Sequence, residues 1–99
     1  MIAVEQTQFL SSKDSIKDAV IIKTLGHPIR LKILLMLDRS NCNVKHIWEC
    51  LGMEQATVSQ HLAVLKNRGI ISSSRMGVEM RYTIANSLAQ KIVTALTKN

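Results

Sequence analysis

The sequence predicts a small, mainly α-helical domain with one short β-hairpin, in the order α-α-α-α-β-β-α. Three observations lead to this prediction: apolar residues recur at helical spacing, glycines stand where helices would end, and one later segment alternates apolar and polar residues. With 99 residues, of which 46% are hydrophobic, the chain suits one domain over residues 1–99 with a thin core. A core of this size favours support from a partner chain.

The charge of the chain is strongly positive. A formal net charge of +6 draws the molecule towards a polyanion such as nucleic acid, although many unrelated proteins are equally basic. The N-terminus lacks the pattern of a signal peptide, and the longest apolar runs, 19–22 and 33–37, are too short to cross a bilayer. We therefore expect no membrane contact and a cytoplasmic location, in which Cys42 and Cys50 would be reduced thiols.

The first part of the chain predicts an N-terminal arm and two helices. Residues 1–12 show no clear period and are assigned to the arm. Ser15 and Asp18 have the spacing of a capping box, and the helix they would start ends near Gly26. Pro28 fits the first position of a second helix, which is apolar on almost every side to residue 37 and is therefore expected at the centre of the core.

A helix-turn-helix is predicted over residues 43–69. Its first helix has apolar residues at positions i, i+3, i+4 and i+7, namely Val44, Ile47, Trp48 and Leu51. Asn43 suits the N-cap of this helix, and Gly52 suits the residue just past its end. A short link then leads to a second helix from Gln55, closed by Arg68 and Gly69.

The second helix combines an apolar stripe with an unusual outer face. Val58, Leu62 and Leu65 form the stripe. The other side carries short or amide-bearing groups: Ala56, Thr57, Ser59, Gln60 and Ala63. Such a face fits a DNA major groove, where glutamine can pair with adenine and small side chains can touch the thymine methyl group. The alternative for this helix alone is a surface helix of modest polarity.

Residues 70–84 predict a wing, which makes the expected fold class a winged helix-turn-helix. Two strand-like runs, 70–74 and 78–84, flank a turn at residues 75–77. The second run alternates, so one face is expected to be buried, comprising Val78, Met80, Tyr82 and Ile84. Asn86 then caps a last helix over residues 86–97, whose seam of Leu88, Ile92 and Leu96 lies beside Ala89 and Val93. We expect this seam to dimerise; the alternative is packing on its own core.

This order of motifs resembles the ArsR/SmtB family of small bacterial winged-helix transcriptional repressors. The segments that carry the resemblance are residues 23–34, 57–65 and 81–84. The resemblance implies a homodimer built on the first and last helices, which binds an inverted-repeat operator in double-stranded DNA. Each recognition helix would enter a major groove, with half-sites about 34 Å apart.

The resemblance also implies which residues meet DNA. The helix positions that match the family's contacts are Gln55, Thr57, Ser59 and Gln60. Gln60 is the best candidate for direct base readout. Lys66 and Arg68 are expected to act through general electrostatics, and Arg75 and Arg81 to reach phosphates or the minor groove from the wing. Two positions depart from the family: Val78 replaces a common wing arginine, and Glu54 replaces a serine cap.

The family's metal ligands are missing. The thiolate pair would fall at Asn43 and Lys45, and the last helix contains no His, Asp, Glu or Cys. His27 and His46 are dispersed, and His61, at the edge of the apolar stripe, is expected to be a packed histidine. We expect no metal and no cofactor.

Other functions remain as alternatives. Cys42 and Cys50 are too far apart for a bridge within one helix, so bystander thiols are favoured over a thiol-based redox-responsive repressor. No carboxylate pair, phosphate-binding loop or nucleophile–base spacing indicates an enzyme. The rival to a DNA-binding regulator is a protein-interaction module that keeps the winged-helix scaffold and binds through its apolar terminal helices.

Overall fold

The computed structural model of the protein describes residues 13–40 and 44–98. The expected arm, Cys42 and the expected cap Asn43 lie outside the described residues. The helices and strands follow in the order α2 (Lys13–Leu25), α3 (Pro28–Ser40), α4 (Val44–Leu51), α5 (Gln55–Asn67), β1 (Ile71–Met76), β2 (Glu79–Ile84) and α6 (Ser87–Thr97). The predicted order α-α-α-α-β-β-α and the winged helix-turn-helix fold are confirmed.

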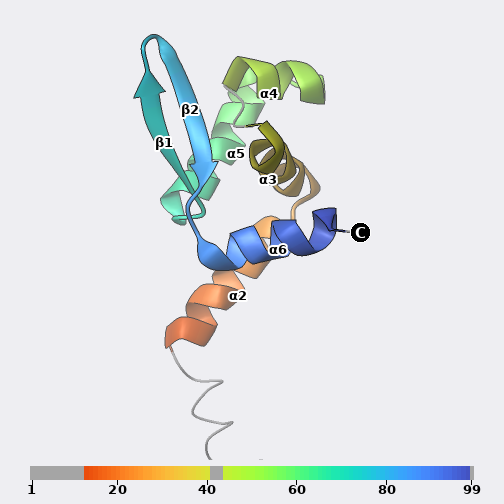
Figure 1. Cartoon of the computed structure of the whole chain (residues 1–99), viewed down its shortest axis with the longest axis vertical. Helices are drawn as coiled ribbons and strands as arrows, with labels where there is room; N and C mark the ends of the chain where they lie inside the picture. The colour runs from red at the N-terminus through yellow and green to blue at the C-terminus, as the bar shows by residue number, and fades with distance from the viewer. Residues whose placement is uncertain (1–12, 41–43, 99) are drawn as a thin grey trace, which may run out of the picture.

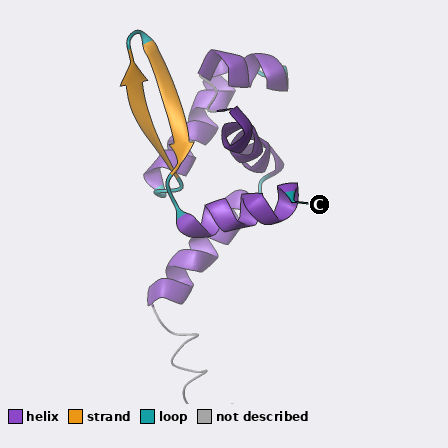
Figure 2. Ribbon diagram, in the orientation of Figure 1, coloured by secondary structure: helices purple, strands orange, loops and turns teal. Residues whose placement is uncertain are grey.

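Helix α3 occupies the centre of the molecule, as its apolar composition predicts. Figure 1 shows α4 and α5 on one side of it, α6 crossing on the other, and α2 extending away from the body. The hairpin stands beside these helices and does not cover them (Figure 2). Ile33 and Leu34 of α3 are completely buried. The other buried apolar side chains of the core are Ile21, Leu25, Leu37, Ile47, Val58, Leu62, Leu65, Ile70, Ile71, Ala89 and Val93.

The starts of α2 and α3 differ in how well the sequence locates them. Helix α2 begins at Lys13, so Ser15 and Asp18 lie inside it and the predicted capping box is wrong. The reason is that serine is also tolerated inside the first turns of a helix, where the two-residue pattern cannot fix the boundary. Pro28 is the first residue of α3, as predicted, and the cap before it is His27, whose Nδ1 accepts a hydrogen bond from the Ile29 N–H at 3.1 Å.

Gly52 turns the chain between the two helices of the helix-turn-helix, as predicted. Its φ of 63° lies in the left-handed region that favours glycine. The Gly52 N–H donates to the Glu49 carbonyl at 3.2 Å, and the Met53 N–H donates to the Trp48 carbonyl at 3.1 Å. These two bonds satisfy carbonyls at the end of α4 and fix the direction in which α5 leaves it.

The turn of the wing is tighter than the sequence indicates, because β1 continues to Met76. Strands β1 and β2 pair antiparallel from Ile71↔Ile84 to Met76↔Glu79, so Arg75 and Met76 belong to β1 and only Gly77 and Val78 form the turn. Gly77, with a φ of 65°, permits this two-residue reversal. Val78 is therefore 97% exposed, and its prediction as part of the buried face is wrong.

Helix α6 begins with the cap that the sequence predicts. Asn86 Oδ1 accepts a hydrogen bond from the Ala89 N–H at 2.8 Å. Ala89 and Val93 are fully buried in the core of this chain, Leu88 and Ile92 are half-buried, and Leu96 is exposed. The helix thus packs on its own core through one edge and leaves part of its apolar seam uncovered.

Replacing Asn86 by alanine should lower the free energy of unfolding by about 1 kcal/mol, because the N–H groups at the start of α6 lose their side-chain acceptor. Urea denaturation followed by circular dichroism measures the change. Asn86→Ser keeps an acceptor and is the control; equal losses in both variants would contradict a capping role.

Candidate nucleic-acid interface

The apolar stripe of α5 decides which side of this helix faces solvent. Val58, Leu62 and Leu65 are at most 2% exposed. Because an α-helix repeats every 3.6 residues, burial of this stripe turns the opposite side outwards. That exposed side carries Gln55, Ala56, Ser59, Gln60 and Ala63, whereas the predicted contact Thr57 is half-buried at its edge.

The recognition surface, as we call Gln55, Thr57, Ser59 and Gln60, therefore gathers on the N-terminal two turns of one helix. Glu54 precedes it as the N-cap, in an extended conformation, and its side chain makes no capping hydrogen bond to the first turn. Lys66 lies near the other end of α5, about 16 Å from Gln55 at the rise of a regular helix. The surface is thus short, polar and free of bulky charge except for the Glu54 carboxylate.

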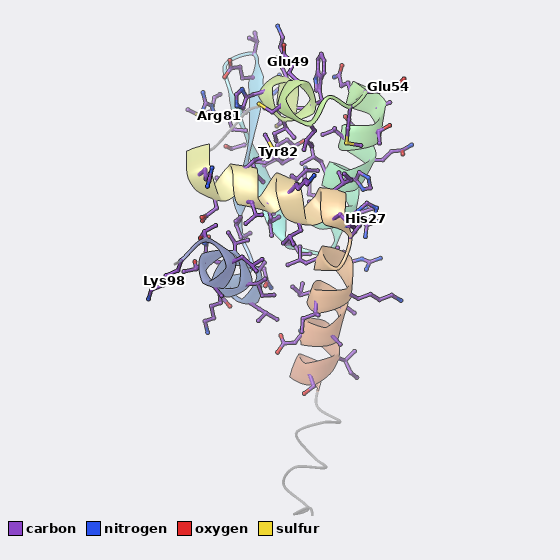
Figure 3. The ribbon with its side chains drawn as sticks, turned by 90° about the vertical axis from the view of Figure 1, so that its right-hand side faces the viewer. His27, Glu49, Glu54, Arg81, Tyr82 and Lys98 are labelled. Carbon is purple, nitrogen blue, oxygen red and sulfur yellow. The ribbon has the colours of Figure 1, made fainter. Side chains whose placement is uncertain are left out.

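The wing places its two arginines differently. Arg75 is exposed on β1. Arg81 on β2 is half-buried, and its Nη2 lies 3.2 Å from Glu79 Oε2 in an ion pair. Arg81 and Tyr82 of the same strand are labelled in Figure 3, and Tyr82 is partly buried and packs against the core. The hairpin is further joined by a hydrogen bond between the Ser72 and Thr83 hydroxyls at 3.1 Å.

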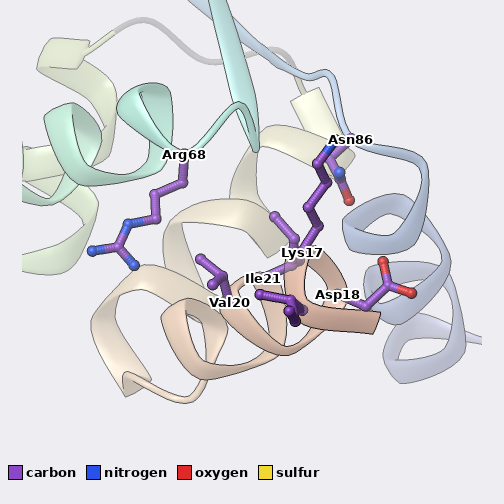
Figure 4. Close-up of a pocket in the computed structure, with 7 residues that line it drawn as sticks. Lys17, Asp18, Val20, Ile21, Arg68 and Asn86 are labelled. Atoms are coloured by element: carbon purple, nitrogen blue, oxygen red, sulfur yellow. The ribbon is translucent and has the colours of Figure 1, made fainter. Parts of the chain in front are cut away.

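Arg68 makes a contact that sequence analysis does not foresee. Its Nη1 donates to Thr24 Oγ1 at 3.1 Å, and the Thr24 hydroxyl itself donates to the Val20 carbonyl at 2.7 Å. Figure 4 shows Arg68 reaching from the end of α5 towards α2, on the side away from Asn86. Thr24 is 1% exposed, so this chain of bonds ties the end of the recognition helix to the core-facing side of α2.

His61 joins the recognition helix to the start of α3. Its ring centroid lies 4.6 Å from that of His27, with the ring planes tilted by 52°. Partial burial lowers the pKa of His61 below its usual range, and the neighbouring His27 and Arg30 lower it further. The prediction of a packed histidine agrees with this contact. The His27 partner was missed, since a contact between residues far apart in sequence leaves no local signal.

A thiol–imidazole pair on α4 was also missed. Cys50 Sγ lies 3.4 Å from His46 Nε2, and the spacing of four residues in a predicted helix is the signal that could have found it. Within residues 13–40 and 44–98, no three His, Cys, Asp or Glu side chains come together as a metal site would require. Over the same residues, every helix is too short or too polar to span a bilayer.

Comparison with known proteins gives a consistent result. Residues 27–73 match the model of the arsR family of bacterial regulatory proteins. The transcriptional repressor PagR of Bacillus anthracis is 36% identical over 90 residues, which cover 90% of this chain and 87% of PagR. Its crystal structure superposes with a TM-score of 0.78 at 35% identity, covering 85% of this chain and 97% of that one. HlyU of Vibrio cholerae superposes with a TM-score of 0.81 at 28% identity, covering 86% and 92%.

Acidification should destabilise the protein through His61. Because the folded-state pKa of His61 is lowered, the unfolded chain takes up the proton first, and the free energy of unfolding falls as the pH drops below about 6.5. Urea denaturation between about pH 7.5 and pH 5 measures this slope. His61→Gln should flatten it, whereas His46→Gln, at an exposed histidine of α4, controls for loss of an imidazole elsewhere. Equal slopes in His61→Gln and wild type would contradict the assignment.

Proposed function

The chain belongs to the arsR family of bacterial regulatory proteins, and from this premise we propose that it represses transcription as a homodimer on an inverted-repeat operator in double-stranded DNA. Like its relatives, it is a DNA-binding regulator of transcription and not an enzyme. The observation that carries the proposal is the recognition surface, in which Gln55, Ser59 and Gln60 are exposed while the apolar stripe behind them is buried.

The chemistry of the recognition surface supports base readout. The exposed amide of Gln60 carries both a donor and an acceptor, which is the combination that pairs with N6 and N7 of adenine in the major groove. We assign Gln60 to base contact, Ser59 and Thr57 to a mixture of base and phosphate contacts, and Gln55 to the phosphates near the start of the helix. Alanines 56 and 63 leave room for α5 to approach the base edges closely.

Cations outside the recognition surface are proposed to bind phosphates. Lys66 and Arg75 are exposed and can reach the DNA backbone without breaking a contact in the protein. Arg81 would reach it only beside Glu79, and Arg68 would exchange its bond to Thr24 for a phosphate, so both are weaker candidates. Counterion release by these groups makes affinity fall with rising salt concentration.

A second copy of this chain is the partner that the terminal helices favour. The exposed fractions on α2 are 60% for Ile16, 38% for Val20 and 57% for Ile22, and Leu96 on α6 is 55% exposed. A hollow of about 630 Å³ lies along α2, with Ile16, Val20 and Ile21 in its wall. Apolar side chains this exposed on two neighbouring helices are typical of an interface between subunits. The proposed dimer places two recognition helices on successive major grooves.

Replacing Gln60 and Ser59 together by alanine should weaken binding to the operator by about tenfold or more, since base contacts of this kind contribute about 1–3 kcal/mol each. A mobility-shift assay on the DNA flanking the gene of this protein, against an unrelated duplex, measures the loss. Asn67→Ala removes an exposed amide from the far end of α5 and should bind as the wild type does. A double variant that keeps its sequence selectivity would sink the proposed readout. A wild-type protein that binds neither duplex selectively would favour the protein-interaction module instead.

Replacing Glu54 by glutamine should strengthen DNA binding several-fold at low salt, because it removes the carboxylate nearest the recognition surface while the lost charge makes no capping hydrogen bond. The gain should shrink as salt is raised. Asp38→Asn on α3 changes the net charge equally but outside α5, keeps the oxygen that accepts a hydrogen bond from Gln90, and serves as the control. Identical gains in the two variants would mean that only the total charge matters.

Replacing Ile16 by glutamate should raise the dimer dissociation constant by about 100-fold, because a charge would be buried in an apolar interface. Sedimentation equilibrium measures the constant. Lys45→Glu on α4 introduces the same charge at an exposed position outside the proposed interface and should leave the dimer intact. A wild-type protein that is monomeric at micromolar concentration would rule out the homodimer.

A further inference from the structure

Helix α4 carries a thiol beside an imidazole. Cys50 Sγ lies 3.4 Å from His46 Nε2 and 3.9 Å from His46 Nδ1, and both residues are exposed to solvent. Their spacing of four residues places them on the same side of the helix, one turn apart. An imidazole at this distance can accept the proton of the thiol, and the thiolate that results is the nucleophilic form of cysteine.

Cys50 also lies in the wall of a hollow between α3, α4 and α6. The hollow has a volume of about 520 Å³, which is the size that small organic ligands occupy. Its wall includes two cationic side chains of α3, Lys32 and Arg39, and an apolar part formed by Leu35, Met36 and Leu51. Leu96 of α6 also lines it, so the hollow borders the proposed subunit interface. None of the described residues that line it is acidic. The thiol therefore faces a space that favours a ligand with both negative charge and apolar atoms.

We propose that Cys50 is a modification site for thiol–disulfide exchange with a small anionic organic disulfide. Lys32 and Arg39 attract the disulfide, and His46 activates the thiol that attacks it. The positive wall selects carboxylate-bearing molecules through charge complementarity. The hollow is large enough for an organic molecule, which distinguishes this ligand from a peroxide that needs no binding site. His46 and Cys50 supply only two metal ligands, which is too few for a closed metal site.

The exchange step is balanced without a further reactant. The Cys50 proton passes to His46, and the Cys50 thiolate attacks one sulfur of the disulfide R–S–S–R. The new bond joins Cys50 Sγ to one R–S group as the old S–S bond breaks, and the other R–S group leaves as a thiolate that takes up the proton from His46. The disulfide is the oxidant: one of its sulfurs is reduced to a thiol while Cys50 is oxidised to the mixed disulfide.

The test uses the Cys42→Ser protein, in which Cys50 is the single remaining thiol of a chain that has two cysteines. Glutathione disulfide, which is anionic, and cystamine, which is cationic, are added separately in the presence of a chelator, and intact-protein mass spectrometry follows the adduct. Relative to free cysteine under the same conditions, the protein should prefer glutathione disulfide by about tenfold. No adduct, or no preference, would overturn the proposal.

Two sets of variants separate the hollow from the general charge of the protein. Lys32→Gln with Arg39→Gln should abolish the preference, whereas Lys23→Gln with Lys91→Gln removes two exposed lysines outside the hollow and should retain it. A preference unchanged in the first pair would refute the role of the hollow. Because these rates are measured on the protein alone, their outcome is separate from that of the DNA-binding experiments.

His46 has its own readout. His46→Asn should slow adduct formation by about tenfold near pH 7 but much less near pH 9, where hydroxide replaces the imidazole as the acceptor of the proton. A change in packing alone would slow the reaction equally at both pH values, and that result would exclude activation by His46.

Discussion

Burial of one stripe of α5 is the constraint on which the rest of the interface depends. Val58, Leu62 and Leu65 fix the rotation of this helix about its own axis, since they must face the core formed around α3. Once that rotation is fixed, the short polar side chains can only face outwards. The readout proposed for α5 is therefore a consequence of packing: the same helix turned by half a revolution would present leucines to the groove and place glutamine amides in the core.

Ile70 connects the recognition helix with the elements that follow it. Its N–H donates to the Leu65 carbonyl at 2.9 Å, and its own carbonyl accepts from the Ala85 N–H at 2.8 Å and the Asn86 N–H at 3.3 Å. The Ile70 side chain is completely buried. One residue thus ends α5, closes the base of the wing and positions Asn86 to cap α6. Together with the Arg68–Thr24 bond, the contacts of Ile70 explain how α5 keeps a fixed position relative to α2 and α6.

Local patterns predicted most of this fold because they report local physics. The spacing of Val44 to Leu51, the glycine at position 52 and the cap at Asn86 each describe contacts within a few residues, and the structure contains all of them. The same reasoning failed where a boundary depends on more than a pattern, as at Ser15 and Val78. It also could not foresee that Arg68 would bond to Thr24 or that His27 would meet His61, because folding alone brings these residues together.

The shared carbonyl of Ile70 closes the wing at its base, where the hairpin is tied to the helices. Both ends of the hairpin meet at this one acceptor, and Tyr82 and Ile84 of β2 pack against the core. Residues 74–79 at the other end of the hairpin are exposed, so a change of charge there leaves the packing of α5 and α6 in place. The tip of the wing is therefore the part of the hairpin that can change its surface chemistry without cost to the core.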